Sequence, residues 1–329
     1  MQNSFSLSFS KSGLKLAVLH QTHLRLFNSL DYTEITSSDN HYLSIFEFYE
    51  DSNLLFLVGS GEIPQSSQRV LSVYNYKSNN IITELAFEHR IKSVCSNLIR
   101  LIIALDEKIF VLKTDNFKCI VCISDLNILK NVNLAQSTEY CLMAYTNSES
   151  QGYVHIFDCF NGDRVNVLSC HKSNIAILSL SFTGKKLATA SAKGTIIKLF
   201  DSITGDLLQQ FQRGMSVAVI YSLVFINSDE DLVVTSNTGT LHIFQIGGDK
   251  GEKKVLQLFL SVLPPNCYNH LNSEQSLVST VTGFAGKLFV CAVNSKNFIL
   301  IFDSNLNYTL SSYGNRNYSI LKKGRLDVF

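Results

Sequence analysis

Short runs of alternating apolar and polar residues recur along the whole chain, and each run ends in an aromatic or large apolar residue. Successive run ends are 38 to 58 residues apart, and all but the last spacing lie between 38 and 47. Alternation with a period of two predicts β-strands, and a repeat of about 40–45 residues predicts the blades of a β-propeller. The runs end near Phe27, Tyr74, Leu112, Phe157, Phe200, Phe244 and Phe302.

Each repeat contains enough polar, glycine-bearing turns for four strands. In the fifth repeat the strands are expected at 177–182, 186–191, 195–200 and 206–211, and the sixth follows the same plan. A unit of this size cannot bury its own faces, and stacking against neighbours solves that problem. We therefore predict an all-β fold, with residues 1–329 forming one seven-bladed β-propeller of WD-repeat type with four-stranded antiparallel blades. A two-domain β-sandwich is the alternative.

The last spacing is long because of an insertion at about 246–275, between the expected third and fourth strands of the sixth unit. Basic residues precede an apolar run there, which suits a membrane interface. The alternative is a strand or loop that packs on the propeller edge. The residues concerned are Lys253, Lys254, Leu256, Leu258, Phe259 and Leu260.

Composition narrows the function. With 46% hydrophobic residues in 329, the chain can bury a large core, but its 28 basic and 27 acidic residues give a net charge of only +1. That balance argues against a nucleic-acid surface, so any anion site must be local. No apolar run is long enough for a transmembrane helix, and residues 4–9 alternate like a strand rather than a signal peptide.

No catalytic or metal-binding pattern stands out. The eight cysteines are scattered, and the pair Cys119 and Cys122 has no second pair to complete a zinc site. P-loop, GxSxG and HExxH motifs are absent from the sequence. Asp158, Asp201 and Asp303 each follow the strand expected third in its unit, as repeating turn residues would. We expect no enzyme activity, no cofactor and no metal.

The peptide Phe211-Gln212-Arg213-Gly214 lies where the fifth unit passes to the sixth. It resembles the Phe-Arg-Arg-Gly motif of the PROPPIN family, the WIPI-type propellers of autophagy, with one arginine replaced by glutamine. Longer segments carry the same resemblance: 53–76 is similar to the family's second blade, 170–201 to its fifth and 220–244 to its sixth. Within the first of these, Ser60 stands where the family has a glycine.

The resemblance implies a seven-bladed propeller that binds phosphatidylinositol 3-phosphate and phosphatidylinositol 3,5-bisphosphate in two shallow pockets. In the family the two motif arginines point in opposite directions, one into each pocket, and a hydrophobic loop of blade six inserts into the bilayer. Carried onto this chain, the second pocket keeps every expected residue type, with guanidinium, hydroxyl and imidazole groups that suit a phosphate. Its residues are Arg213, Gly214, Ser236, Thr240 and His242.

The first pocket is expected to be weaker, because Gln212 replaces its arginine. Lys198 keeps a charge there but not the bidentate geometry of a guanidinium. A hydrogen bond to a charged group contributes roughly 1.5–3 kcal/mol, so the loss corresponds to about a 10- to 100-fold weakening. The residues of this pocket are His171, Thr189, Ser191, Gly194, Thr195, Lys198 and Gln212.

Each residue assigned to a pocket could instead have a purely structural role. Arg213 could be an ordinary surface arginine, and His242 could be a structural histidine of a strand, as we expect for His155. Thr189 and its neighbours could be hydroxyls that satisfy backbone groups.

Two functions remain. One is a cytoplasmic, monomeric peripheral membrane protein that reads the two lipids and acts as a scaffold for autophagy proteins on autophagosomal precursor, endosomal or vacuolar membranes. The other is a protein-interaction propeller that has lost lipid binding.

Overall fold

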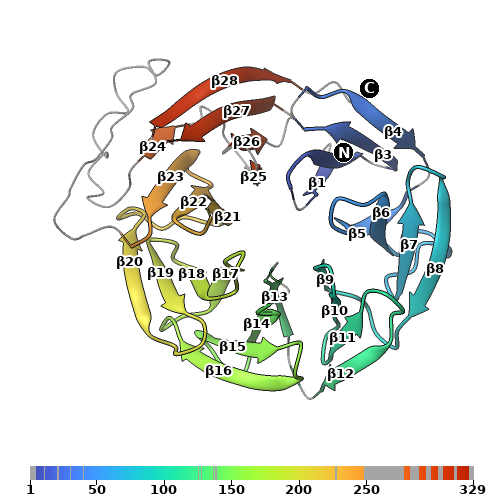
Figure 1. Cartoon of the computed structure of the whole chain (residues 1–329), viewed down its shortest axis with the longest axis horizontal. Coiled ribbons are helices and arrows are strands. Elements are labelled where there is room, and N and C mark those ends of the chain that lie inside the picture. The colour runs from blue at the N-terminus through green and yellow to red at the C-terminus, as the bar shows by residue number, and fades with distance from the viewer. Residues whose placement is uncertain are drawn as a thin grey trace. The chain divides into compact units, whose positions relative to one another are not determined.

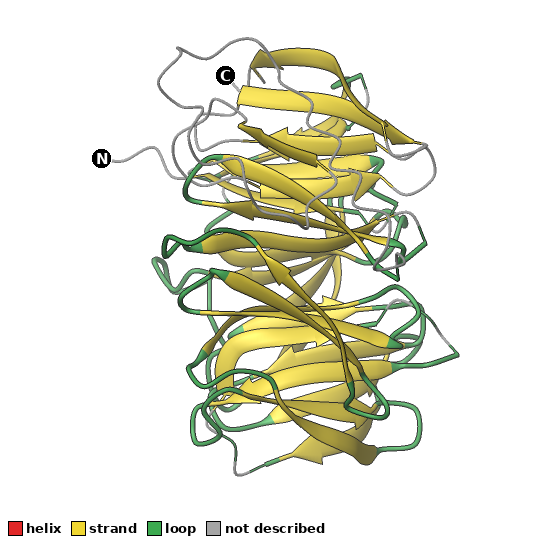
Figure 2. Cartoon of the chain, turned by 90° about the vertical axis from the view of Figure 1, so that its left-hand side faces the viewer, coloured by secondary structure: helices red, strands yellow, loops and turns green. Residues whose placement is uncertain are grey.

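The chain is built from β-strands (Figures 1 and 2). The computed structural model describes residues 5–10, 12–20, 22–29, 31–39, 41–124, 126, 128–135, 137, 139–226, 228–247, 278–281, 289–293, 298–302, 307–314 and 317–325. Within these ranges no helix is long and apolar enough to cross a bilayer. In the described part of the chain the strands form seven four-stranded sheets, each made of four strands that are consecutive in the sequence.

The first three sheets come from the N-terminal part of the chain, and their strands pair antiparallel. The first contains β1 (Phe5–Phe9), β2 (Lys15–His20), β3 (His23–Asn28) and β4 (Glu34–Ser38). The second contains β5 (Leu43–Phe48), β6 (Leu54–Gly59), β7 (Val70–Asn75) and β8 (Asn80–Ala86). The third contains β9 (Ser93–Ser96), β10 (Arg100–Ala104), β11 (Ile109–Lys113) and β12 (Cys119–Ile123).

The other four sheets follow the same plan. The fourth contains β13 (Ile128–Leu134), β14 (Leu142–Asn147), β15 (Tyr153–Asp158) and β16 (Asp163–Ser169). The fifth contains β17 (Ile175–Leu180), β18 (Lys186–Ser191), β19 (Ile196–Asp201) and β20 (Leu207–Gln212). The sixth contains β21 (Ile220–Ile226), β22 (Asp231–Ser236), β23 (Thr240–Gln245) and β24 (Val278–Val281). The seventh contains β25 (Phe289–Val293), β26 (Phe298–Phe302), β27 (Asn307–Gly314) and β28 (Asn317–Arg325).

The four-strand plan of each repeat is confirmed, but the position expected for one strand is wrong. The strand that ends at Phe302 was expected to be third in its unit, before Asp303, and it is second in the seventh sheet. The reason is that Val278–Val281 pairs with β23 and completes the sixth sheet, so the seventh begins only at Phe289. The predicted insertion falls between β23 and β24, and most of its residues lie outside the described ranges.

The chain divides into two compact units. The first contains residues up to Glu149 together with Asp158–Asp163, and the second contains Ser150–Phe157 and Arg164–Arg325. In the first unit, apolar clusters join sheet one to sheet two and sheet two to sheet three. The second unit contains the candidate site, and its arrangement is described below. That residues 1–329 form one propeller domain stays a prediction.

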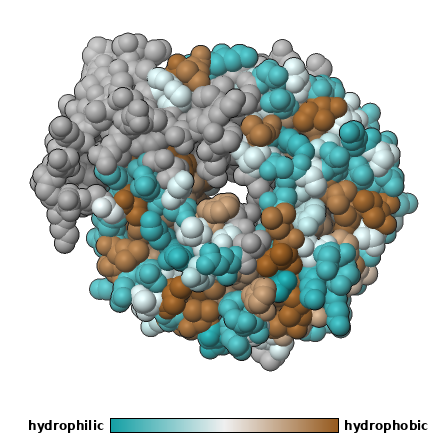
Figure 3. Space-filling view, in the orientation of Figure 1, coloured by the Kyte–Doolittle hydropathy of each residue, from teal (hydrophilic) through white to brown (hydrophobic). Residues whose placement is uncertain are grey.

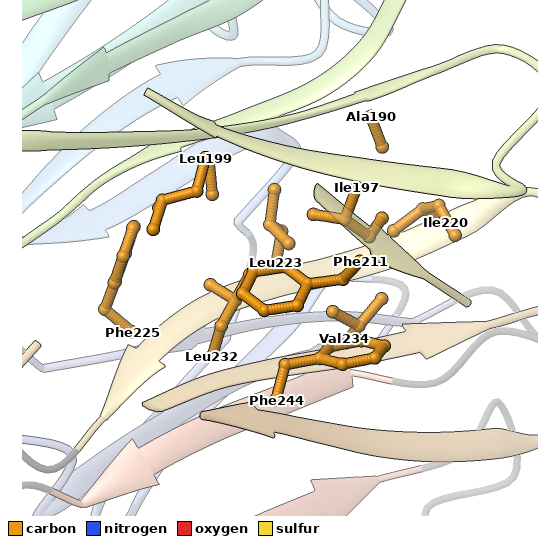
Figure 4. Close-up of a cluster of buried hydrophobic side chains, with 11 residues drawn as sticks. Ala190, Ile197, Leu199, Phe211, Ile220, Leu223, Phe225, Leu232, Val234 and Phe244 are labelled. Carbon is orange, nitrogen blue, oxygen red and sulfur yellow. The ribbon is translucent and has the colours of Figure 1, made fainter. Parts of the chain in front are cut away.

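Sheets five and six of the second unit are joined by a buried apolar cluster (Figure 4). The rings of Phe211 at the end of β20 and Phe244 on β23 stack with centroids 4.9 Å apart. Ile197 and Leu199 of β19 and Leu223 of β21 belong to the same cluster. Because packing at this density leaves little room for sliding, the cluster fixes β20 against the sixth sheet.

A carboxylate fastens the same two sheets at their other end. Asp229, in the turn between β21 and β22, is 5% exposed. Its oxygens accept hydrogen bonds from the backbone N–H of Phe182 at 2.9 Å and from the N–H and hydroxyl of Thr183 at 3.1 and 2.9 Å. Asp229 has a φ of 68°, a left-handed conformation that aspartate and asparagine tolerate better than most residues.

We expect Asp229→Ala to destabilise the protein by about 2–4 kcal/mol, because three hydrogen bonds to a buried carboxylate are lost together. Asp229→Asn keeps a carbonyl acceptor and the tolerance for a positive φ, so its effect should be smaller. Thermal unfolding of the three proteins measures this order. An alanine variant that melts at the wild-type temperature would show that the carboxylate does not hold the sheets together.

Candidate functional site

Most of the predicted site residues lie at one edge of sheets five and six, where the chain passes from β20 to β21. Register places the ends of all the strands involved on this edge: Ile175 lies opposite Ser191, Ile196 opposite Gln212, and Ile220 opposite Ser236. We call it the 213 edge, and it consists of residues 170–175, 189–198, 212–224 and 234–242. None of these residues is acidic, whereas the turns at the opposite edge contain Asp206, Asp229 and Glu230.

Arg213 is the centre of the 213 edge. Its side chain is only 6% exposed, so it is not an ordinary surface arginine. The Nε–H donates to the carbonyl of Gly194 at 2.6 Å, an Nη2–H donates to the carbonyl of Ser216 at 2.5 Å, and the backbone N–H donates to the carbonyl of Thr195 at 2.9 Å. Burial lowers the pKa of the guanidinium from its usual value, but the usual value of an arginine lies so far above neutrality that the group stays charged at neutral pH.

The buried charge of Arg213 has no carboxylate partner within ion-pair distance among the described residues. A guanidinium has five N–H donors, and the two bonds to carbonyl oxygens use two of them. Because a buried charge is costly without a counter-ion, this arrangement favours an anion from outside the chain.

Gly194 makes the close approach to the Arg213 turn possible. Its φ is +62°, and a Cβ atom there would lie 1.9 Å from the carbonyl oxygen of Ala218. Any larger residue would push apart the two turns that hold Arg213. The role of Gly194 is therefore in the backbone, whereas at Gly214 a Cβ would meet nothing within 4 Å.

Hydroxyl groups and an imidazole line up beside Arg213. The Oγ atom of Ser236 lies 3.3 Å from Oγ1 of Thr240, which in turn lies 3.1 Å from Nε2 of His242. Thr238 bridges the first two, with its Oγ1 at 2.7 and 2.9 Å from them. The pKa of His242 is lowered to about 4, first by burial and then by the charge of Arg213, so the ring is neutral at physiological pH.

A second cluster lies on the same edge around His171. Its Nε2 is 3.1 Å from Oγ1 of Thr189, and the Nζ of Lys198 donates to the carbonyl of Cys170 at 2.8 Å. Burial and then the charge of Lys198 lower the pKa of His171 to about 4, although a hydrogen bond with the backbone of Thr189 acts in the opposite direction. Gln212 is exposed on the edge strand β20.

Comparison with known proteins identifies the family. A profile described as PROPPIN matches residues 6–253. The chain belongs to the PROPPIN family. The curated relatives include autophagy-related protein 18 of Komagataella pastoris, 30% identical over 74% of this chain and 52% of the relative, and its namesake of Dictyostelium discoideum, 32% identical over 73% and 64%. This PROPPIN thus spans about half to two thirds of the length of these relatives.

Solved structures confirm the β-propeller fold. Kluyveromyces lactis Hsv2 with its complete loop 6CD superimposes with a TM-score of 0.76, at 16% identity, over 99% of this chain and 100% of the other. KlAtg21, in a complex with the coiled-coil of AgAtg16, superimposes with a TM-score of 0.79, at 22% identity, over 98% and 100%. Membership of this family of non-enzymatic scaffold proteins also confirms the prediction that the chain is not an enzyme.

The structure of this PROPPIN brings together the side chains predicted for each pocket only in part. Arg213, Ser236, Thr240 and His242 form one cluster, and His171, Thr189 and Lys198 form another. Ser191 and Thr195 contribute through their backbone carbonyls, which accept bonds from Gly194 and from Arg213.

Sequence reasoning missed Thr238, which could have been found because hydroxyl residues alternate at 236, 238 and 240. It also missed Gly152, whose carbonyl accepts the N–H groups of Cys170 and His171. No group of three or more ligand-type residues in the described part could hold a metal ion. The predicted membrane residues Lys253, Lys254, Leu256, Leu258, Phe259 and Leu260 lie outside the described residues.

His242 should make the stability of this PROPPIN sensitive to acid. Its folded pKa of about 4 lies below the ordinary value of 6.5, so the unfolded chain binds more protons between these values. The protein therefore has the full stabilisation from His242 above pH 6.5. As the pH falls towards 4, the free energy of unfolding decreases, and the loss due to His242 is about 2 kcal/mol at pH 5.

We expect His242→Gln to remove this component, so that its melting temperature falls several degrees less than that of the wild type between pH 7 and pH 5. Other buried histidines are common to both proteins, and the difference between the two curves isolates position 242. Parallel curves would show that His242 titrates normally in the folded protein.

Proposed function

We propose that this protein binds phosphatidylinositol 3-phosphate, phosphatidylinositol 3,5-bisphosphate or both at a membrane surface, through the 213 edge. The observation that carries the proposal is the buried guanidinium of Arg213, which has no carboxylate partner among the described residues and lies on an edge without acidic side chains. A phosphate monoester supplies the missing negative charge and enough acceptor oxygens for several donors at once.

The neighbouring groups have complementary tasks. Arg213 has three N–H donors beyond its two carbonyl bonds, and the hydroxyls of Ser236, Thr238 and Thr240 can each turn a proton towards an oxygen anion. Burial is the larger cause of the low pKa of His242 and the charge of Arg213 the smaller. A phosphate nearby would raise this pKa by offsetting the charge of Arg213, and so would favour the protonated ring as a further donor.

The cluster around His171 provides the weaker of two sites in this proposal. Lys198 is the cation there, and its ammonium donates one bond to the carbonyl of Cys170. Gln212 offers an amide where a guanidinium would give a charged fork. Binding through two sites multiplies affinities through effective concentration, so a weak first site also lowers the avidity of the whole edge.

The proposal includes scaffolding of other proteins. The relatives are named as autophagy-related proteins, and KlAtg21 has been solved with the coiled-coil of AgAtg16. By analogy, we place this protein as a monomer on autophagosomal precursor, endosomal or vacuolar membranes, where it recruits autophagy proteins. The basic and apolar segment at 246–275 is proposed to insert into the same bilayer.

The second candidate is a protein-interaction propeller without lipid binding. Two observations favour it: Gln212 has replaced a cation, and Arg213 already donates to the backbone carbonyls of Gly194 and Ser216. In that case Arg213 braces the fold and the 213 edge binds no lipid.

The decisive experiment compares Arg213→Thr and Arg213→Lys with wild type in vesicle flotation. Vesicles contain no phosphoinositide, the 3-phosphate, the 4-phosphate or the 3,5-bisphosphate. We expect wild type to float with the 3-phosphorylated lipids, threonine to weaken this at least ten-fold, and lysine to keep part of the binding because it retains the charge but not the fork.

Arg164→Thr removes an exposed arginine from β16 of the same unit and is the matched control. Melting temperatures of all variants separate loss of binding from loss of fold, since Arg213 also braces two turns. Wild type that floats with no lipid, or a folded threonine variant that binds like wild type, would contradict the proposal and leave the scaffold function.

Gln212→Arg should strengthen binding to 3-phosphorylated lipids by about ten-fold, because it restores a charged hydrogen bond and raises avidity. Gln210→Arg adds the same charge two residues away on the exposed side of β20. Equal gains in the two variants would indicate general electrostatic attraction, and no gain at position 212 would show that the first site does not contribute.

A further inference from the structure

The turn that follows Arg213 exposes three apolar side chains in alternation. Met215 is 91% exposed, Val217 is 69% exposed and Val219 is 53% exposed, while Ala218 between the last two is only 2% exposed. Single exposed apolar residues are ordinary on protein surfaces. On the face shown in Figure 3, hydrophilic and hydrophobic residues are interspersed over the described part of the chain. Exposure alone therefore does not distinguish this turn.

What distinguishes the turn is that its backbone is fastened along its length. The carbonyl of Ser216 accepts an Nη2–H of Arg213 at 2.5 Å, and the N–H of Ala218 donates to the carbonyl of Lys193 at 3.0 Å. Val219 and Asn237 exchange two hydrogen bonds, each 3.0 Å long. The alternating apolar side chains thus stand on a braced support, which lowers the entropy lost when they are immobilised.

The surroundings of the turn show which partner fits it. The 213 edge has no acidic residue, and Lys172 and Lys193 are exposed on it in addition to the buried Arg213 and the half-buried Lys198. Braced apolar side chains next to exposed lysines are complementary to an anionic lipid surface, where the lysines meet head groups and the apolar groups enter the interface.

We propose that the turn Met215–Val219 is itself a membrane-inserting contact, which places Met215, Val217 and Val219 in the acyl interface while Arg213 binds the head group. This inference rests on the proposed function, because that function brings the 213 edge to the bilayer. It adds a source of affinity that depends on apolar burial and does not require a particular head group.

The chain contains no tryptophan, so a single introduced indole reports on one position alone. Met215→Trp is compared with Phe182→Trp, because Phe182 is 54% exposed in the turn at the opposite edge of sheet five. Vesicles contain phosphatidylcholine alone, with phosphatidylserine, or with phosphatidylinositol 3-phosphate, and a parallel set contains brominated acyl chains. We expect a blue shift and quenching by the brominated chains for position 215 and no change for position 182.

Affinity provides the second measurement. Met215→Ser combined with Val217→Ser should weaken binding to vesicles that contain the 3-phosphate by roughly ten-fold or more, because two apolar side chains no longer leave water. Phe182→Ser should have no effect. Met215 and Val217 are both exposed, so we expect the double variant to melt at the wild-type temperature, which would confirm that its fold is intact.

The outcomes separate this inference from the function on which it rests. Flotation with the 3-phosphate while the indole at 215 stays in water overturns the inference alone and indicates that the turn serves another partner. A blue shift on phosphatidylserine vesicles that the 3-phosphate does not enhance supports the inference and contradicts the proposed lipid selectivity. Failure to float with any vesicle overturns both.

Discussion

The buried guanidinium of Arg213 is the constraint on which the 213 edge depends. A charge that is 6% exposed needs partners, and the carbonyl oxygens of Gly194 and Ser216 supply two of them. These bonds bring the β18–β19 turn against the connection from β20 to β21, so closely that only glycine fits at position 194. The shape of the edge, and the outward direction of the apolar turn after it, follow from this one side chain.

The same constraint sets the electrostatics of the edge. Burial, together with a nearby cation, keeps His171 and His242 neutral, so the edge avoids a concentration of positive charge in the absence of a ligand. An arriving anion reverses this balance, because it stabilises the protonated imidazole. Under the proposed function, the edge would take up protons when an anion binds, which would couple anion binding to pH through groups that lie within the fold.

The repeat and its four-strand plan could be predicted from the sequence because they depend on local patterns. The strand at 186–191 has the predicted bounds, since alternation and glycine turns specify it without reference to distant residues. The place of the strand ending at Phe302 could not be predicted, because pairing of Val278–Val281 with β23 is a choice between sheets.

The same distinction explains the candidate site. The residue types around Arg213 follow from the resemblance, and they lie together in the second unit. The burial of Arg213 and its bonds to backbone carbonyls could not be predicted. Every residue has a backbone carbonyl, so the sequence does not indicate that those of Gly194 and Ser216 accept these bonds. The depressed pKa values of the two histidines likewise depend on packing that only the fold provides.

Neighbouring positions at the end of β20 differ in how strongly a substitution would disturb the fold. Phe211 and Arg213 are buried, whereas Gln212 between them is exposed, as alternation along a strand requires. Replacing a cation by glutamine at the exposed position leaves the core cluster and both braced turns unchanged. Replacing Arg213 would remove the brace itself. Under the proposed function, a chain of this fold can therefore weaken the first proposed site without cost to its structure, while the second is tied to the stability of the edge. In that proposal, affinity lost at the first site is most easily recovered by contacts that require no new buried charge, and the exposed apolar side chains of Met215, Val217 and Val219 would be contacts of that kind.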